Sequence, residues 1–485
     1  MHNAIGGEDK SLLISNLKLG GEGINRFEFG SRESSFKNKE MDLLNIDKNK
    51  MLSELKRIQW AMYVICVLAY MLTLFHRITP AIMGPDLMQD LQLNAVSFGF
   101  MGLAFTWVYA FAQAPVGTML DTLGPRKGIT AILVLAAVGG VVFSVAETFP
   151  VLIIGRVLLA LAVSGFLIGG AKILSVWFTT KQYPVLWGLF MGLGALGSVF
   201  GTSPLRSMMS SYGWRSSMLG IGIFSLVLAI IAYMILRDKP ADKGLLTPDE
   251  LADEVVATKT VIKTIEEKVS IKTVLSMPIL WLIGLLSLGV NSSSQTFGSM
   301  WEGIYLASVF GFDKTAIGGI LVWYAWGLVI GCFASGPIVR MFGSQKTMLA
   351  GTIAFLINWL FIAIQPGSMG ITGLQVFNFF MGSLQMVVIS TTFIFIREVI
   401  PVSRLGTAMG IVNSFAWILG AGIFQQLWGF IINSISKGVQ PYPLEAFQVA
   451  LWVQMIMITV GVLCAFYIWR KYNNTQQNAT TNVEV

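Results

Sequence analysis

Long apolar runs alternate with short polar segments along most of this chain. A helix that crosses a bilayer needs about 20 mainly apolar residues, and about twelve runs reach this length. Their centres lie at Ala69, Trp107, Ala137, Val163, Ala195, Leu226, Leu288, Leu328, Leu356, Met386, Ala416 and Met457. Each run is helix-length rather than strand-length. The pattern therefore predicts an all-α, polytopic membrane protein with twelve transmembrane helices.

Basic residues are concentrated in alternate connections between these runs. One set of connections holds most of them: Lys56, Arg57, Arg126, Lys127, Lys181, Arg237, Lys239, Arg340, Lys346, Arg397, Arg404, Arg470 and Lys471. The opposite set holds far fewer, chiefly Arg206, Arg215, Lys314 and Lys437. Because cytoplasmic loops of membrane proteins are enriched in basic residues, we expect both termini and the middle loop in the cytoplasm.

A long polar interruption divides the chain into two halves. Between residues 238 and 275, lysine and glutamate alternate as they do on solvated surfaces. The sequence therefore predicts five segments: a disordered cytoplasmic N-terminal tail (1–56), an N-terminal six-helix bundle (57–237), a cytoplasmic linker (238–275), a C-terminal six-helix bundle (276–471) and a cytoplasmic tail (472–485).

Two motifs of the first half return in the second half. Three residues of one connection recur at one constant spacing, with Gly117, Gly124 and Lys127 matching Gly336, Gly343 and Lys346. A second match pairs Gly-Leu-Phe-Met-Gly at 188–192 with Gly-Thr-Ala-Met-Gly at 406–410. Two matches at nearly equal offsets predict that the bundles are pseudo-symmetric copies of one six-helix unit.

The composition agrees with a bilayer as the solvent of this protein. Of the 485 residues, 54% are hydrophobic and 12% charged, whereas a soluble globular protein has roughly 25% charged residues. The net charge of +7 does not indicate a nucleic-acid partner, because the basic residues lie in short loops rather than on one soluble face. Cys66, Cys332 and Cys464 lie in separate apolar runs, so neither a disulfide framework nor a metal site is expected.

The connection between the second and third runs carries the most specific motif of the sequence. It reads Gly-Thr-Met-Leu-Asp-Thr-Leu-Gly-Pro-Arg-Lys over residues 117–127, with a weaker copy at 336–346. This motif resembles the signature of the major facilitator superfamily, and the resemblance extends from about Trp60 to Lys471. It implies the major facilitator fold, in which this loop latches the outward-open state. The resemblance assigns that latch to Gly117, Asp121, Gly124 and Arg126.

Further residues resemble the organic-anion porters of the anion:cation symporter group within that superfamily. The stretch His-Arg-Ile-Thr-Pro-Ala at 76–81 is similar to the Asp-Arg pair of the group, and Arg156 corresponds to an arginine of its fourth helix. In the group the first arginine binds the substrate carboxylate. The resemblance therefore implies substrate-binding roles for Arg77 and Arg156.

Two departures from that group concern proton coupling. The group has a protonatable aspartate beside its first arginine and usually a glutamate later in the fourth helix, where this chain has His76 and Val163. Histidine titrates in the physiological range, so His76 is the candidate for the coupling group. The alternative interpretation is a polar residue near the outer interface.

The cationic residues of the N-terminal runs favour an anionic ligand. Arg77 has no acidic residue one helical turn away, and an unpaired arginine inside a membrane costs several kcal/mol. An anionic ligand, a residue on another helix, or snorkelling to the interface would each relieve that cost. Together with Arg156 and Lys172, Arg77 makes this half attractive to anions.

Uncharged polar residues mark the C-terminal half instead. The run Asn-Ser-Ser-Ser-Gln at 291–295 cannot face lipid with all its side chains. We expect some of them to face a wet cavity or neighbouring helices, with a local break in this helix. We expect four amide side chains to contribute to substrate binding: Asn291, Gln295, Gln385 and Asn413.

The leading interpretation is a secondary active transporter that moves a small organic anion by alternating access. An efflux pump for amphiphilic compounds and a uniporter of a neutral solute such as an amino acid or nucleoside remain as alternatives. An enzyme is not expected, because His2 and His76 are the only histidines and no nucleophile–base pair or cofactor motif is present. We expect a cofactor-free monomer in a bacterial inner membrane, with lipid, the small-molecule substrate and a coupling proton as its partners.

Overall fold

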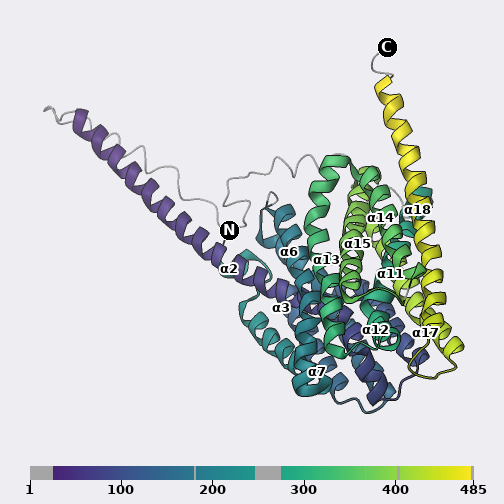
Figure 1. Ribbon diagram of the computed structural model, residues 1–485. Helices are drawn as coiled ribbons and strands as arrows, with labels where there is room; N and C mark the ends of the chain where they lie inside the picture. The colour runs from purple at the N-terminus through teal and green to yellow at the C-terminus, as the bar shows by residue number, and fades with distance from the viewer. Residues whose placement is uncertain (1–25, 180–181, 246–274, 366, 401–404, 482–485) are drawn as a thin grey trace. The chain divides into compact units, whose positions relative to one another are not determined.

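Helices form every regular element of the described residues, which are 26–179, 182–245, 275–365, 367–400 and 405–481 of this computed structural model (Figure 1). Contacts between residues divide the chain into two units, Met1–Arg57 and Ile58–Val485. The predicted linker (238–275) and the two predicted tails lie partly outside the described residues. Helix α2 begins at Arg26, within the segment predicted to be a disordered tail. The boundaries of the two predicted bundles stay a prediction.

The first half of the sequence forms the helices α2 (Arg26–Asp90), α3 (Ala95–Ser144), α4 (Phe149–Val163), α5 (Phe166–Trp177), α6 (Tyr183–Phe200), α7 (Ser203–Ile235) and the short η1 (Pro240–Lys243). The second half forms α11 (Pro278–Thr296), η2 (Phe297–Trp301), α12 (Glu302–Phe310), α13 (Lys314–Phe342), α14 (Ser344–Ile364), α15 (Ile371–Val399), α16 (Leu405–Phe415), η4 (Ala416–Gly422), α17 (Ile423–Ser436) and α18 (Leu444–Thr481). Both η2 and η4 are π-helical.

Nine helical stretches of the described residues are long and apolar enough to cross a membrane. Two of them, Ala95–Ser144 and Val185–Ile235, have 50 and 51 residues. A straight helix of that size would be about 75 Å long, more than twice the hydrocarbon thickness. Each instead contains a glycine with positive φ, Gly124 (79°) or Gly213 (75°), where two helices meet. With α11–α12, which η2 interrupts, the described residues provide the predicted twelve crossings.

The internal repeat is visible in the backbone as well as in the sequence. Gly124 has φ 79° and ψ 157°, and its counterpart Gly343 has φ 81° and ψ 157°. Glycine adopts these values without the penalty that a Cβ atom brings. Equivalent loops of the two halves therefore make the same turn.

Close helix approach explains the glycine-rich stretch of α6. A Cβ atom on Gly194 would overlap the ring of Tyr70, and one on Gly197 would overlap the backbone carbonyl of Met71. Small residues let membrane helices approach closely. This stretch is therefore a packing surface for α2.

The two halves of the sequence meet closely at one end of the helices. We call it the Asp86 end, and we call the opposite end, where α3 turns at Gly124, the Asp121 end. At the Asp86 end, Gly303 of α12 lies directly against the carbonyl of Ala81 on α2, and Gly429 of α17 lies against Ala95 at the start of α3. These contacts place helices of the two halves side by side.

Candidate functional site

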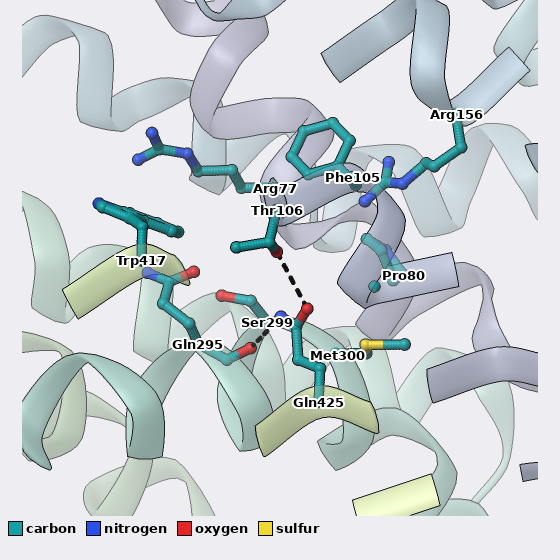
Figure 2. A pocket seen from close by; sticks show the side chains of 11 residues that line it. Arg77, Pro80, Phe105, Thr106, Arg156, Gln295, Ser299, Met300, Trp417 and Gln425 are labelled. Carbon is teal, nitrogen blue, oxygen red and sulfur yellow. Dashed lines mark hydrogen bonds between the residues drawn. The ribbon is translucent and has the colours of Figure 1, made fainter. Parts of the chain in front are cut away.

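A narrow cavity of about 10 Å³, room for about one water molecule, lies between helices of the two halves. Helices α2, α3 and α4 contribute one side of its lining, and α11, η2, η4 and α17 contribute the other. Its lining residues are Arg77, Pro80, Gly102, Phe105, Thr106, Arg156, Gln295, Ser299, Met300, Trp417 and Gln425. Figure 2 shows the two arginines on one side, and Gln295, Ser299 and Gln425 on the other.

Arg77 reaches from α2 to the opposite half of the chain. Its guanidinium carbon lies 4.5 Å from the ring centroid of Tyr109 on α3 and 4.3 Å from that of Trp417 on η4. Such cation–π contacts attract about 0.5–2 kcal/mol each. The Nε atom of Arg77 is buried and has no hydrogen-bond partner. The aromatic faces hold the cation in place but leave hydrogen-bonding capacity for a ligand.

Arg156 is buried more deeply, with 3% of its surface exposed. Its guanidinium carbon lies 4.0 Å from the ring centroid of Phe105, and NH1 donates a 2.9 Å hydrogen bond to the carbonyl of His76. That carbonyl is free because Pro80, four residues on, has no backbone N–H to donate to it. Pro80 thereby creates the acceptor that positions Arg156.

The cavity is electrostatically positive. Its lining includes two arginines and no carboxylate. Neither arginine forms a salt bridge with any acidic residue in the described part of the chain. Because a buried unpaired cation is costly, this cavity is complementary to an anion.

A hydrogen-bonded amide, Gln425 of α17, links α11 on its own side of the cavity to α3 on the other side. Its Oε1 accepts from the hydroxyl of Thr106 at 3.1 Å, and its Nε2 donates to the carbonyl of Gln295 at 3.1 Å. The indole of Trp301 donates to the carbonyl of Gln425 at 3.0 Å. Sequence analysis missed Gln425 and Ser299, although a glutamine inside an apolar run is itself a signal.

The other predicted amides surround the cavity rather than line it. Gln385 donates to Asn291 Oδ1 at 3.3 Å and accepts from the hydroxyl of Tyr324 at 2.9 Å. Asn413 accepts from the indole of Trp417 at 3.1 Å. Of the predicted binding residues, Arg77, Arg156 and Gln295 therefore share the cavity, and the others contact residues around it.

His76 lies beside the cavity but does not line it. Its side chain is buried at 1% exposure, and both ring nitrogens lack hydrogen-bond partners. Its ring meets Phe75 edge-on. Its backbone carbonyl, rather than its imidazole, contacts Arg156.

Both π-helical segments border the cavity. The predicted break in the helix of residues 278–310 is present, and it follows the polar run directly as η2. The second π-helical segment, η4, carries Trp417. π-Helical turns are frequent at functional sites because they widen the helix and leave backbone groups available.

The predicted latch residues make their contacts within the first half of the sequence. Asp121 forms a 2.7 Å ion pair with Lys172, and its side chain is 75% exposed. The backbone N–H of Arg126 donates to Asp238 at 2.9 Å, and its side chain stacks on Tyr233 at 4.5 Å. Gly117 contacts Ile168 loosely, and a Cβ atom on Gly124 would meet the Asp238 carboxylate.

An ion cluster at the Asp86 end was not predicted. Asp86 of α2 accepts from Arg206 NH1 of α7 at 2.7 Å and also pairs with Lys314 at the start of α13. Only 8% of the Arg206 side chain and 14% of the Asp86 side chain are exposed. The cluster joins helices of the two halves at the Asp86 end.

Comparisons with known proteins agree with this architecture. A family model described as Major Facilitator Superfamily matches residues 65–303 and 291–483. A hexuronate transporter of Escherichia coli (strain K12) is 22% identical over 437 residues, which is 87% of this chain and 96% of that protein.

A further transporter and a solved structure are also similar to this chain. A nitrate/nitrite transporter of a Picosynechococcus species is 26% identical over 199 residues, covering 35% of this chain and 37% of that protein. A crystal structure of a bacterial homologue of the human lysosomal transporter Spinster, inward-facing and unoccupied, is similar in fold with a TM-score of 0.66 at 14% identity. It covers 86% of this chain and 98% of that chain.

Proposed function

This chain belongs to the major facilitator superfamily, and from that premise we propose that it is a secondary transporter of a small organic anion that binds in the two-arginine cavity. The observation that carries the proposal is the pair Arg77 and Arg156 on one cavity whose lining holds no carboxylate. Guanidinium groups bind carboxylates through paired, charge-assisted hydrogen bonds. Gln295, Ser299 and Gln425 then supply neutral hydrogen-bonding groups for the rest of the solute.

The names of similar proteins support an anion as the class of substrate. The relatives include a hexuronate transporter and a nitrate/nitrite transporter, both named for anions. A hexuronate combines one carboxylate with several hydroxyl groups. The carboxylate and hydroxyl groups of such a solute correspond to the cations on one side of the cavity and the amides on the other.

We further propose that the Asp121 end faces the cytoplasm. Arg126, Lys127 and Lys346 lie at that end, and cytoplasmic loops are enriched in basic residues. The Asp86 end then faces outward, and its closely packed helices close the cavity from outside. Alternating access requires that these contacts open and re-form in each cycle.

Transport of D-glucuronate into proteoliposomes tests this function. Replacing Arg77→Gln or Arg156→Gln should reduce kcat/KM by about 30-fold or more, because a lost buried charge contact costs about 2 kcal/mol or more. The matched control is Arg215→Gln, whose arginine pairs with Asp90 outside the cavity lining. Uptake by Arg77→Gln at the wild-type rate would contradict the proposal.

A thermal-shift comparison of three solutes separates the alternatives. D-Glucuronate should raise the melting temperature of the purified protein, whereas D-glucose, which has the same ring without the carboxylate, should not. Nitrate as the third solute reports whether a small inorganic anion suffices. Equal stabilisation by glucose and glucuronate would instead favour a carrier of neutral solutes.

A further inference from the structure

Besides His76, the buried ionisable side chain of Glu302 also lies outside the cavity lining. Glu302 is the first residue of α12, directly after the π-helical η2, and its exposure is 0%. Two residues of η2, Ser299 and Met300, line the cavity. Glu302 is thus separated from the cavity by one turn of the irregular helix.

The hydrogen bonds of Glu302 are incomplete in a specific way. Its Oε1 accepts from Asn378 Nδ2 of α15 at 2.6 Å, while its Oε2 is buried and has no partner. The amide oxygen of Asn378 is also buried without a partner. Both orphan atoms are acceptors when the carboxyl is ionised. A proton on Oε2 would turn one of these two acceptors into a hydrogen-bond donor.

The surroundings also favour a carboxyl without charge. Glu302 forms no salt bridge with any arginine, lysine or histidine of the described residues. Among the described residues, two phenols interact electrostatically with Glu302, those of Tyr305 on the same helix and Tyr324 of α13, and Tyr324 also interacts with Arg77. Burial of an isolated carboxylate is costly, so the neutral acid is the form that this site accommodates.

A contact between the two halves lies directly beside Glu302. The next residue, Gly303, lies directly against the carbonyl of Ala81 on α2. That carbonyl is free because Pro85 has no N–H to donate to it. Beyond the contact, Ile304 lines a cavity at the Asp86 end together with Pro85 and Gln440. Separation of α12 from α2 would therefore open the contact beside Glu302 toward this cavity.

We propose that Glu302 is the site that carries the coupling proton of this transporter, an inference that rests on the proposed function. When the Asp86 end opens, a proton from water binds Oε2, and the carboxylate becomes a carboxylic acid paired with Asn378. When the cycle returns, the acid releases that proton to water on the other side. One proton moves with one monoanionic substrate, so each cycle is electroneutral.

His76 is the competing candidate, and charge separates the two residues. A proton on His76 would add a positive charge next to Arg156, which its backbone already contacts. A proton on Glu302 removes a negative charge from a site that has no cation to balance it. The His76→Gln variant should accordingly keep proton coupling.

Infrared spectroscopy of the purified protein in liposomes tests the protonated carboxyl without any substrate. At neutral pH the wild type should show a C=O stretching band of a carboxylic acid, and Glu302→Gln should lack it. Glu302→Asp should retain a band, and Glu445→Gln, which replaces an exposed glutamate of α18, should match the wild type. A wild-type spectrum without that band, or an unchanged band in Glu302→Gln, overturns the proposal.

Transport measurements then test coupling itself, with D-glucuronate as the probe. A gradient of one pH unit can sustain about tenfold accumulation for one proton per cycle. Wild type and Glu445→Gln should accumulate the probe, whereas Glu302→Gln should only equilibrate it while still exchanging it between compartments. Accumulation by Glu302→Gln equal to wild type overturns the assignment. If the wild type moves no probe, the proposed function fails, and the infrared result still decides whether Glu302 holds a proton.

Discussion

Arg156 depends on a single backbone acceptor for its orientation. The carbonyl of His76 receives Arg156 NH1 at 2.9 Å and also the hydroxyl of Thr79 at 3.1 Å. It is available because Pro80 interrupts the hydrogen-bond ladder of α2. A proline in a membrane helix is tolerated when neighbouring groups satisfy the carbonyl that it frees. Here the neighbouring group is the guanidinium of Arg156, which lines the cavity.

The variant Pro80→Ala tests this dependence. A restored N–H at position 80 would compete with Arg156 for the His76 carbonyl. D-Glucuronate affinity should therefore fall about fivefold to tenfold, the equivalent of a hydrogen bond worth about 1–1.4 kcal/mol. Equilibrium binding to purified protein measures this change. The control Pro115→Ala alters an exposed proline of α3 and should leave affinity unchanged; an unaltered affinity in Pro80→Ala would refute the positioning role.

At the residue scale, the binding roles predicted from sequence stay a prediction. The resemblance implied Arg77 and Arg156, the polar run at 291–295 suggested Gln295, and the structure places all three on one cavity. Gln425 and Glu302 were not predicted, because a lone polar residue in an apolar run does not show which helix it will face. Their partners, Thr106 and Asn378, lie far away in the sequence.

At the scale of elements, the two copies of the loop motif each turn at a glycine with positive φ. Gly124 and Gly343 share nearly the same positive φ and the same ψ. Their surroundings differ, because a Cβ atom on Gly124 would meet the carboxylate of Asp238, whereas one on Gly343 would meet open space. Conformational strain and steric overlap can therefore be separated experimentally.

Three alanine substitutions make that separation. Gly343→Ala should cost about 1–2 kcal/mol of stability from backbone strain alone. Gly124→Ala should cost more, because the new Cβ atom also displaces Asp238. The control Gly319→Ala sits in α13 with a helical backbone and open space, so its melting temperature should equal or exceed that of the wild type. Thermal unfolding in detergent gives the order, and equal losses at positions 124 and 343 would exclude the steric contribution.

At the scale of the whole membrane unit, the Asp86 cluster ties α2 and α7 to α13. Asp90 offers a contrast, because it pairs with Arg215 and Trp214 within the first half of the sequence. Loss of either acid removes an ion pair, but only the ion pairs of Asp86 include one between the two halves. This difference provides a matched test of how the outer end closes.

Labelling of a cysteine in the cavity measures that closure. In intact cells, a membrane-impermeant maleimide should label Ser299→Cys about tenfold faster or more when Asp86→Asn is also present, as expected if closure loses about 1.4 kcal/mol or more. Asp90→Asn should not accelerate labelling. Labelling of the native cysteines, Cys66, Cys332 and Cys464, is measured in a chain without Ser299→Cys and subtracted as background. Equal rates for the two acid variants would show that the cluster does not hold this end closed.

The sequence by itself determined the helices, the repeated loop motif and the cationic character of the first half. Apolar length and glycine position are local properties, so they can be read without knowing which helices touch. Only the tertiary structure decided that Arg77 and Arg156 share one cavity, that Asp121 pairs with Lys172, and that Glu302 lacks a partner for Oε2. These facts depend on which helix faces pack together, and that packing is set by contacts between residues far apart along the chain.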